Sequence, residues 1–286
     1  MLNNNNKIRF SVPLLFSLLL VWSCTDLEES PYSVVTPDNF YNTEAELTAA
    51  VVPVYSSLGA AQWGDYMFLQ EVSSDAIVVP TRGGDWDDGG TWRALQLHDW
   101  DASLGFVGGG WSGAYGGIAR ANSTLDALSR AEQTNLVLTY TAETRVLRAF
   151  YYWWLIDLYG DVPLVTDAET DPDNPPAQTS RAEVMDWIVG EINASMPDLE
   201  ESHGSAGYGR LTQGAANTLL ATIYLNAQVY MGMPMWSECK AACDAVINSG
   251  LYALMPTVTD VFAIENEGPA NTENIFVQAT LPLDGV

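Results

Sequence analysis

Lysine and histidine are almost absent from this chain of 286 residues, which contains two of each. Lysine and arginine together number 11, against 36 aspartates and glutamates, so the net charge is −25 at pH 7. A protein this acidic repels polyanions, which argues against binding to nucleic acid and leaves neutral ligands open. The chain is rich in apolar residues, at 48%, so it can form a large core.

Motifs of several enzyme classes are also absent. The chain has no Gly-x-Ser-x-Gly, His-Glu-x-x-His or phosphate-binding loop. His98 stands beside Asp99 without an accompanying nucleophile, which favours a structural hydrogen bond in a loop. Asp85, Asp87 and Asp88 do not continue into a calcium loop, because Gly89 takes the next alternate position. We therefore expect no catalytic residue, no metal and no cofactor.

Cysteine is scarce as well, with three in the chain. Cys239 and Cys243 lie four residues apart on one predicted helix, with no histidine near them. A strained disulfide or half of a metal site is one interpretation of this pair. The interpretation we favour is that both cysteines are small residues of the core.

The third cysteine, Cys24, follows a segment with the form of a signal peptide. Lys7 and Arg9 precede an apolar run, Phe10 to Trp22, that is too short to span a membrane. Val-Trp-Ser-Cys at its end resembles a lipobox, so we predict a lipoprotein signal peptide over residues 1–23, lipidation of Cys24, and a tether over residues 24–40. The alternative is an ordinary secretory signal with an incidental cysteine.

The strongest helical pattern lies between Glu143 and Val165. Apolar and aromatic residues recur there at helical spacing, and the middle of the segment is apolar on nearly every side. Glu143 is expected in the first turn and Gly160 just past the end, with Pro163 as a stop signal. The sequence therefore predicts a central buried helix, whose spaced residues include Val146, Phe150, Trp153, Trp154, Asp157 and Leu158.

Further helices are predicted before and after this one. Thr43 and Glu46 form a capping-box pattern ahead of a helix that Pro53 should kink or end, and Ser180 with Glu183 repeats that pattern. Others are expected over Trp111–Arg130, after the cap Thr212, and from Ser237 to Gly250 with Cys243, Val246 and Ile247 on its apolar face. Thr272 to Ala279 is expected to form a strand.

Residues 69–101, which we call the tryptophan segment, have an unusual composition. Trp86 stands between two aspartates, with paired glycines on both sides, so we expect tight, exposed turns and no regular structure. A tryptophan on such a turn can stack on the apolar face of a sugar ring while charged groups bond to its hydroxyls. The alternative is that the tryptophans anchor a long loop to the domain. The candidate ligand residues here are Arg82, Asp85, Trp86, Trp92 and Trp100.

Several segments together resemble the SusD/RagB family of outer-membrane nutrient-binding lipoproteins. "LRAFYYWWLIDLYGDVPLVT" resembles that family's signature helix, and Arg82 to Trp92 resembles its ligand-contacting segment. Three more stretches are similar to it: "WSGAYGGIARANSTLDAL", "GRLTQGAANTLLATIYLNAQVY" and "CDAVINSGLYALMP". Asn122, in the first of these, is a sixth candidate ligand residue, with a buried amide bonded to loop carbonyls as the alternative.

The resemblance implies an all-α fold: a tetratricopeptide-like array of helical hairpins with long irregular loops and little strand, over residues 41–286. Family members are considerably longer, so a C-terminal half is expected to be missing. The implied function is capture of oligosaccharides at the cell surface by a lipid-anchored outer-membrane protein. A SusC-type TonB-dependent transporter is the implied partner that receives them.

Two other functions stay open at this stage. A glycoside hydrolase would also combine aromatic platforms with carboxylates, although no pair of acids stands out in an apolar setting. A structural cap of the transporter that touches no ligand is the third hypothesis. Release of reducing sugar from oligosaccharides would favour the hydrolase.

Overall fold

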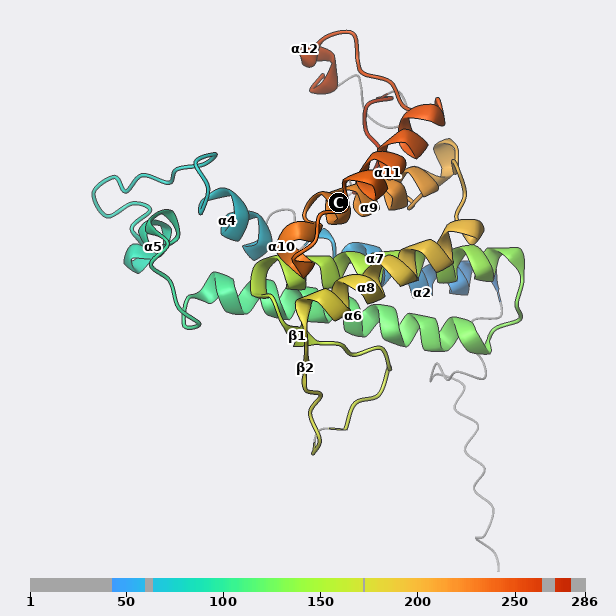
Figure 1. The fold of residues 1–286 in the computed structure, drawn as a ribbon, viewed down its shortest axis with the longest axis horizontal. Helices are drawn as coiled ribbons and strands as arrows, with labels where there is room; N and C mark the ends of the chain where they lie inside the picture. Colours follow the sequence, from blue (N-terminus) through green and yellow to red (C-terminus); the bar gives the residue numbers. More distant parts are fainter. Residues whose placement is uncertain (1–42, 60–63, 172, 264–270, 279–286) are drawn as a thin grey trace, which may run out of the picture. The chain divides into compact units, whose positions relative to one another are not determined.

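The computed structural model describes residues 43–59, 64–171, 173–263 and 271–278 (Figure 1). They belong to one compact unit, residues 40–286. The predicted signal peptide, Cys24 and the tether lie outside the described residues.

Helices are the main regular structure of the described chain, as the sequence predicts. A single pair of two-residue antiparallel strands, β1 and β2, was found among the described residues. The helices are α2 (Glu44–Ser56), α4 (Asp65–Glu71), η2 (Asp88–Gly90), α5 (Thr91–Leu97), α6 (Gly105–Arg130), α7 (Asn135–Tyr159), α8 (Arg181–Ser195), η3 (Met196–Asp198), η4 (Ser205–Gly207), α9 (Gln213–Leu225), α10 (Ala227–Met231), α11 (Trp236–Asn248) and α12 (Val258–Val261). The strands are β1 (Val162–Pro163) and β2 (Gln178–Thr179).

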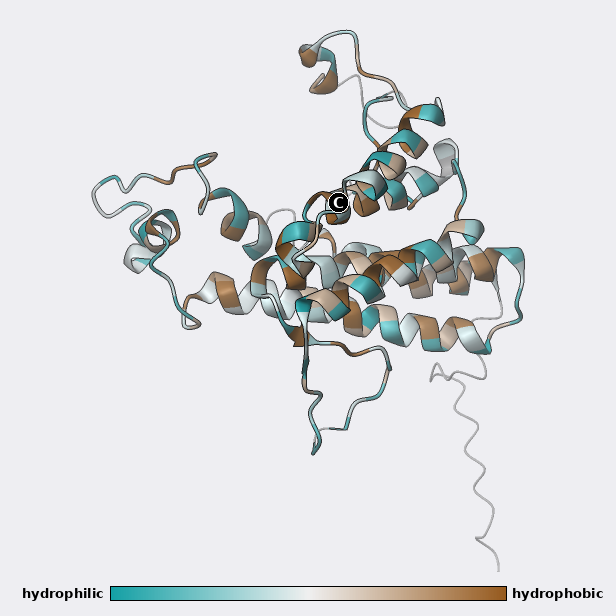
Figure 2. Cartoon of the chain, viewed as in Figure 1, coloured by the Kyte–Doolittle hydropathy of each residue, from teal (hydrophilic) through white to brown (hydrophobic). Residues whose placement is uncertain are grey.

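Neighbouring helices pack as hairpins around α7. Helix α6 packs against α7, α7 against α8, and α9 against α11, while α2 lies against both α6 and α7. Apolar residues run along α6, α7 and α8 (Figure 2). The main core includes fully buried Tyr151, Leu155 and Ile156 of α7 with Ile188 of α8 and Ile223 of α9. This arrangement confirms the predicted helical array with α7 at its centre.

Side-chain caps set where several helices begin. The capping boxes of Thr43 with Glu46 and of Ser180 with Glu183 both form. Each hydroxyl accepts a hydrogen bond from the backbone N–H of the glutamate, and each glutamate carboxylate accepts one from the backbone N–H of the cap residue. Thr212 accepts a hydrogen bond from the backbone of Ala215 and caps α9. These three starts are confirmed.

The predicted start of the central helix was wrong. Helix α7 begins at Asn135, with Thr134 as its cap, so Glu143 lies in its interior and is fully buried. Val137 and Tyr140 are buried and three residues apart, so apolar spacing could have indicated this extension. At the other end Gly160 has a φ of 80°, which glycine adopts without the penalty that a Cβ atom brings.

Two other helix boundaries also differ from the prediction. Helix α6 starts at Gly105 rather than Trp111, although four glycines precede Trp111 in the helix. Helix α2 continues past Pro53 to Ser56, so the proline does not end it at once. Packing of both helices against their neighbours outweighs these unfavourable local preferences.

The C-terminal part of the described chain differs from the prediction in its last long helix and in its expected strand. Helix α11 begins at Trp236, and Ala242 is its one buried residue, while Cys243 and Ile247 are exposed. Both cysteines of this helix are free thiols, and Cys239 is partly buried, so the interpretation as a core pair fails for Cys243. Residues 272–278 form no strand. They lack a partner strand among the described residues, and local sequence preference cannot supply one.

Candidate ligand-binding site

The tryptophan segment is more regular than its composition predicts. It contains η2 and α5, and it packs on a small apolar cluster of its own. Val72, Trp92 and Leu95 form the buried centre of that cluster, and Phe68 and Phe106 pack around it. Trp92 and Leu95 are one turn apart on α5, which is the spacing that could have indicated this helix.

Trp92 anchors the segment. Its side chain is 7% exposed, and its ring centroid lies 5.1 Å from those of both Phe68 and Phe106. Its indole Nε1–H donates a hydrogen bond of 2.6 Å to Asp88 Oδ2. Trp92 therefore has the anchoring role that was one of the two interpretations, and Asp88 holds it.

Trp86 is far more exposed than Trp92. Its side chain is 51% exposed, and its ring centroid is 5.8 Å from that of Trp92, so one part of the ring rests on the anchor. Its φ is 57°, and Asp88 and His98 also have positive φ. Left-handed backbone at residues other than glycine is uncommon and clusters at binding sites. The backbone thus holds an open aromatic surface on a rigid base.

Arg82 and Asp85 flank the turn that precedes Trp86. Their backbones exchange two hydrogen bonds, of 3.0 and 3.1 Å, across Gly83 and Gly84. Residues paired in this way project their side chains to the same face. Both side chains are exposed, and within the described residues neither has a hydrogen-bond or ion-pair partner. An exposed guanidinium and an exposed carboxylate therefore lie on the turn that leads into Trp86.

Trp100 follows at the far end of the segment. It is 43% exposed, and its ring meets the His98 ring edge-on, with centroids 5.4 Å apart. His98 Nε2 lies 2.6 Å from the carbonyl of Ser73, which confirms the predicted structural hydrogen bond. Trp100 thus presents a second exposed ring on the same segment.

Asn122 lies in the helical core instead. Its amide donates to the carbonyls of Val165 and Asp167, at 3.0 and 3.1 Å, and accepts from Arg148 Nη1 at 2.8 Å. The side chain is 3% exposed. These contacts match the buried-amide alternative and link it to no residue of the tryptophan segment. The candidate site below is built from the other five residues.

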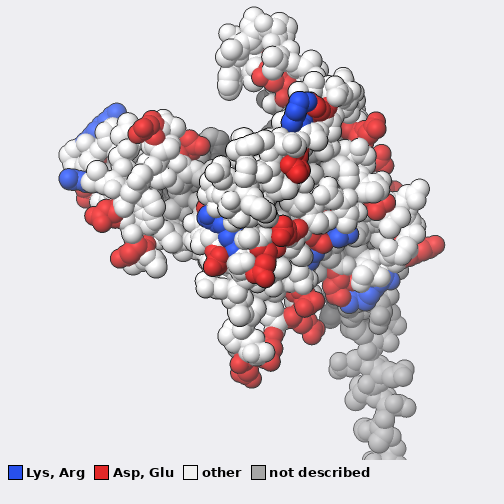
Figure 3. Space-filling model, in the orientation of Figure 1, with Lys and Arg blue, Asp and Glu red and all other residues white. Residues whose placement is uncertain are grey.

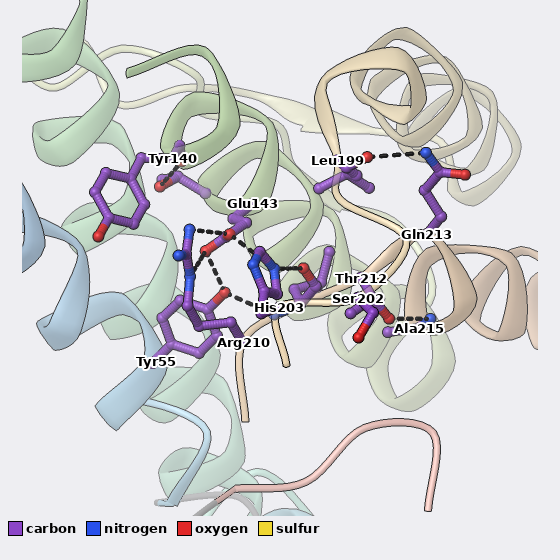
Figure 4. Close-up of polar contacts among 12 residues, drawn as sticks. Tyr55, Tyr140, Glu143, Leu199, Ser202, His203, Arg210, Thr212, Gln213 and Ala215 are labelled. Atoms are coloured by element: carbon purple, nitrogen blue, oxygen red, sulfur yellow. Dashed lines mark hydrogen bonds and ion pairs between the residues drawn. The ribbon is translucent and has the colours of Figure 1, made fainter. Parts of the chain in front are cut away.

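A buried charged cluster joins α2, α7 and the loop before α9 (Figure 4). Glu143 accepts a hydrogen bond of 2.7 Å from Tyr55 and pairs with Arg210, and His203 Nε2 lies 3.3 Å from the same carboxylate. Burial raises the pKa of Glu143, although the bonds from Arg210 and Tyr55 oppose that change. Burial and the Glu143 charge raise the pKa of Tyr55. No local sequence pattern indicated this cluster, because its members lie far apart along the chain.

A large apolar cavity lies beside α7. Its volume is about 620 Å³, and aromatic side chains of α4 and α7 form one side of it. Its lining includes Tyr66, Gln70, Phe150, Trp153, Trp154, Thr218, Thr222, Ile275, Phe276 and Gln278. Asp157, next to these aromatics along α7, accepts hydrogen bonds from Gln70 and Tyr230.

Acidic side chains dominate the charged surface shown in Figure 3. The part of the chain that the structure describes contains no group of three or more His, Cys, Asp or Glu placed to hold a metal ion. Among the same residues, none of the helices is both long and apolar enough to cross a membrane.

Comparison with known proteins agrees with this architecture. Residues 27–225 match the SusD-like family model described as "Starch-binding associating with outer membrane". The chain belongs to the SusD-like family. A SusD-like protein of Bacteroides ovatus is 28% identical over 93% of this chain and 48% of its own length. The starch-binding protein SusD of Bacteroides thetaiotaomicron is 32% identical over 52% of this chain and 26% of its own.

Solved structures share the fold of this SusD-like chain. Surface glycan-binding protein A from Bacteroides thetaiotaomicron, solved with laminarihexaose, superposes with a TM-score of 0.67 at 24% identity, over 82% of this chain and 49% of that one. This likeness confirms the helical, tetratricopeptide-like fold class. The chain spans about half the length of curated relatives such as the Bacteroides ovatus protein.

Proposed function

We propose that this protein binds glycans at the outer membrane without transforming them. The observation that carries the proposal is the half-exposed ring of Trp86, which rests on buried Trp92 and follows the turn that carries the unpaired side chains of Arg82 and Asp85. An aromatic face with a donor and an acceptor at its edge suits a pyranose, because the ring covers the C–H face and the charged groups bond to hydroxyls. Membership of a family described as starch-binding supports it.

The ligand we propose is a neutral glycan. Asp85, Asp87 and Asp88 surround Trp86, and Asp99 and Asp101 flank Trp100, whereas the basic residues of the segment are Arg82 and Arg93. Such an excess of carboxylates repels uronates and sulfated sugars. Hydrogen bonds from the side chain and backbone of Ser103 lower the pKa of Asp101.

We further propose attachment to the outer membrane through lipid on Cys24, exposure at the cell surface, and delivery of the glycan to a SusC-type TonB-dependent transporter. The lipobox-like sequence before Cys24 supports the anchor, and the family description supports the location. The transporter follows from the family resemblance. Copurification of such a transporter with the tagged protein from detergent-solubilised membranes tests that partner.

Calorimetric titration tests the binding proposal. The probes are laminarihexaose and a panel of other neutral oligosaccharides, each paired with an anionic counterpart. Replacing Trp86 by alanine should weaken binding by roughly 5- to 150-fold, since loss of one stacking ring costs about 1–3 kcal/mol. The matched control is Trp236→Ala on α11, because Trp236 is 53% exposed and lies outside the segment. Equal affinities of the two variants, or preference for the anionic sugars, would contradict the proposal.

The same samples test the hydrolase alternative. Incubation with each oligosaccharide, followed by a reducing-sugar assay, should show no release above that of a heat-denatured sample. Release by the native protein would mean that the function is catalytic.

A further inference from the structure

The turn that carries Trp86 has an unfavourable backbone conformation. Four of the five residues from Trp86 to Gly90 have positive φ, and two of these four, Trp86 and Asp88, are not glycine. A residue with a Cβ atom is unfavourable in this conformation and stays in it only where other contacts hold it. The turn therefore needs contacts that keep it from relaxing to ordinary right-handed or extended backbone.

A hydrogen bond between Trp92 and Asp88 supplies such a contact. Trp92 Nε1 donates to Asp88 Oδ2 at 2.6 Å, and bonds to a charged carboxylate are shorter and stronger than bonds between neutral groups. The bond joins an exposed residue of the turn to a buried ring that packs against Phe68 and Phe106. In the part of the chain that the structure describes, no other side-chain hydrogen bond links residues 86–90 to that buried cluster.

The place of the Trp86 ring depends on the same hydrogen bond. Trp86 is two residues before Asp88, and its ring centroid lies 5.8 Å from that of Trp92. Among the described residues, Trp86 has no second aromatic neighbour and its indole nitrogen has no hydrogen-bond partner. Without the bond to Asp88, the backbone that carries Trp86 is free to change conformation, and the ring loses its fixed place against Trp92.

We propose that Asp88 is the positioning residue of the Trp86 ring. It acts through Trp92, because its carboxylate holds the indole N–H and thereby fixes the turn on which Trp86 stands. This role rests on the glycan-binding function proposed above and adds to it a residue that does not itself contact the sugar. A ring that is already in place binds more tightly, because it does not have to be ordered when the ligand arrives.

Asp88→Ala and Asp87→Ala are a matched pair of variants. Each removes one exposed carboxylate from the same turn, but the side chain of Asp87 has no hydrogen-bond or ion-pair partner within the described residues. In calorimetric titration with laminarihexaose, Asp88→Ala should weaken binding by about 10-fold or more, since a hydrogen bond to a charged group contributes at least that factor. Asp87→Ala should stay within about twofold of wild type. Equal losses in the two variants would overturn the proposal.

A double-mutant cycle separates positioning from direct contact with the sugar. Trp92→Phe keeps an aromatic ring but lacks the N–H, so in that background Asp88→Ala should cause no further loss of affinity. The same loss in both backgrounds would mean that Asp88 binds the sugar itself, which is not the proposed role. Asp88→Asn keeps an oxygen that can accept from Trp92, so it should bind more tightly than Asp88→Ala. Equal affinity of those two variants would also contradict the proposal.

Hydrogen exchange tests the turn without any sugar. The backbone N–H of Gly90 donates to the carbonyl of Asp87 at 2.7 Å, and the backbones of Arg82 and Asp85 are paired. Amides of residues 82–92 should therefore exchange faster in Asp88→Ala than in wild type or Asp87→Ala. Unchanged exchange in Asp88→Ala would overturn the positioning role even where glycan binding is confirmed. If wild type binds none of the glycans, the proposed function fails, and exchange alone decides whether Asp88 holds the turn.

Discussion

Gly117 of α6 lies directly against the ring of Tyr151 of α7. A Cβ atom at position 117 would be 2.7 Å from the Cε2 and Cζ atoms of that ring. Tyr151 is fully buried, and its hydroxyl donates a hydrogen bond of 2.6 Å to the carbonyl of Val54 in α2. The ring has no room to move, so glycine at position 117 is what lets the three helices meet this closely.

Replacing Gly117 by alanine should therefore destabilise the fold. Overpacking of a rigid core costs about 1–3 kcal/mol, and chemical denaturation measures it. The control is Gly113→Ala on the same helix, where a Cβ atom would meet nothing within 4 Å. That variant should gain about 0.5–1 kcal/mol, because alanine favours a helix over glycine. A destabilised Gly113 variant would show that helix α6 is not packed as described.

Trp153 and Trp154 should differ in their contributions to stability. Trp154 is 6% exposed and stacks on Tyr66 at 4.6 Å, so Trp154→Ala should cost about 3–5 kcal/mol. Trp153 is only partly buried and lines the open cavity, so Trp153→Ala should cost clearly less. Thermal melts of the two variants make the comparison, and equal losses would mean that the cavity is closed in solution.

Trp92→Ala should loosen the tryptophan segment. The contacts of its ring and its hydrogen bond to Asp88 hold that segment in place, so the segment should lose about 3–5 kcal/mol of stability. Hydrogen exchange over residues 66–106 should speed up, and glycan affinity should fall with it. Trp100→Ala is the control, because that exposed ring anchors little, and its exchange rates should stay unchanged.

Stability should depend on pH through Glu191. Burial alone would raise its pKa, but hydrogen bonds from Arg145 and Arg148 outweigh burial and lower the pKa below 4.5. A carboxylate with a depressed folded-state pKa contributes stability above its unfolded pKa and loses that contribution as pH falls through the folded value. Glu191→Gln should cost roughly 3–5 kcal/mol at neutral pH, because Arg148 is left buried without a charged partner.

Denaturant titrations from pH 7 down to acid measure this dependence. The stability difference between wild type and Glu191→Gln should shrink once the pH drops below the ordinary glutamate value. Exposed Glu132→Gln should show no such convergence. A constant difference across the series would show that the Glu191 ion pairs do not form.

Cys24→Ala should release the protein from the membrane. The apolar run ends at Cys24, and lipid on that residue is the proposed anchor. Cells are labelled with a radioactive acyl chain and then fractionated. The fraction that contains the protein measures its attachment to the membrane, and the label on the protein measures lipidation. Membrane retention of the variant with intact label would exclude Cys24 as the lipidated residue.

The sequence by itself determined the fold class and the starts of several helices. Capping boxes such as Ser180 with Glu183 are local, since all their hydrogen bonds close within four residues, and structure confirms them. The central position of α7 was also predictable, because an all-round apolar helix has no stable place at a surface. The family followed from segments that are contiguous in the chain.

Only the tertiary structure separated the roles of the tryptophans and revealed the charged cluster. Trp86 and Trp92 lie six residues apart in one glycine-rich segment, yet one is an exposed surface and the other an anchor. The reason is that Phe68 and Phe106, from other elements, pack against Trp92. The sequence predicted Glu143 in the first turn of a helix. In the structure it is paired, inside the core, with Arg210, which lies 67 positions away. Burial and pairing depend on which distant segments meet, and no local pattern carries that information.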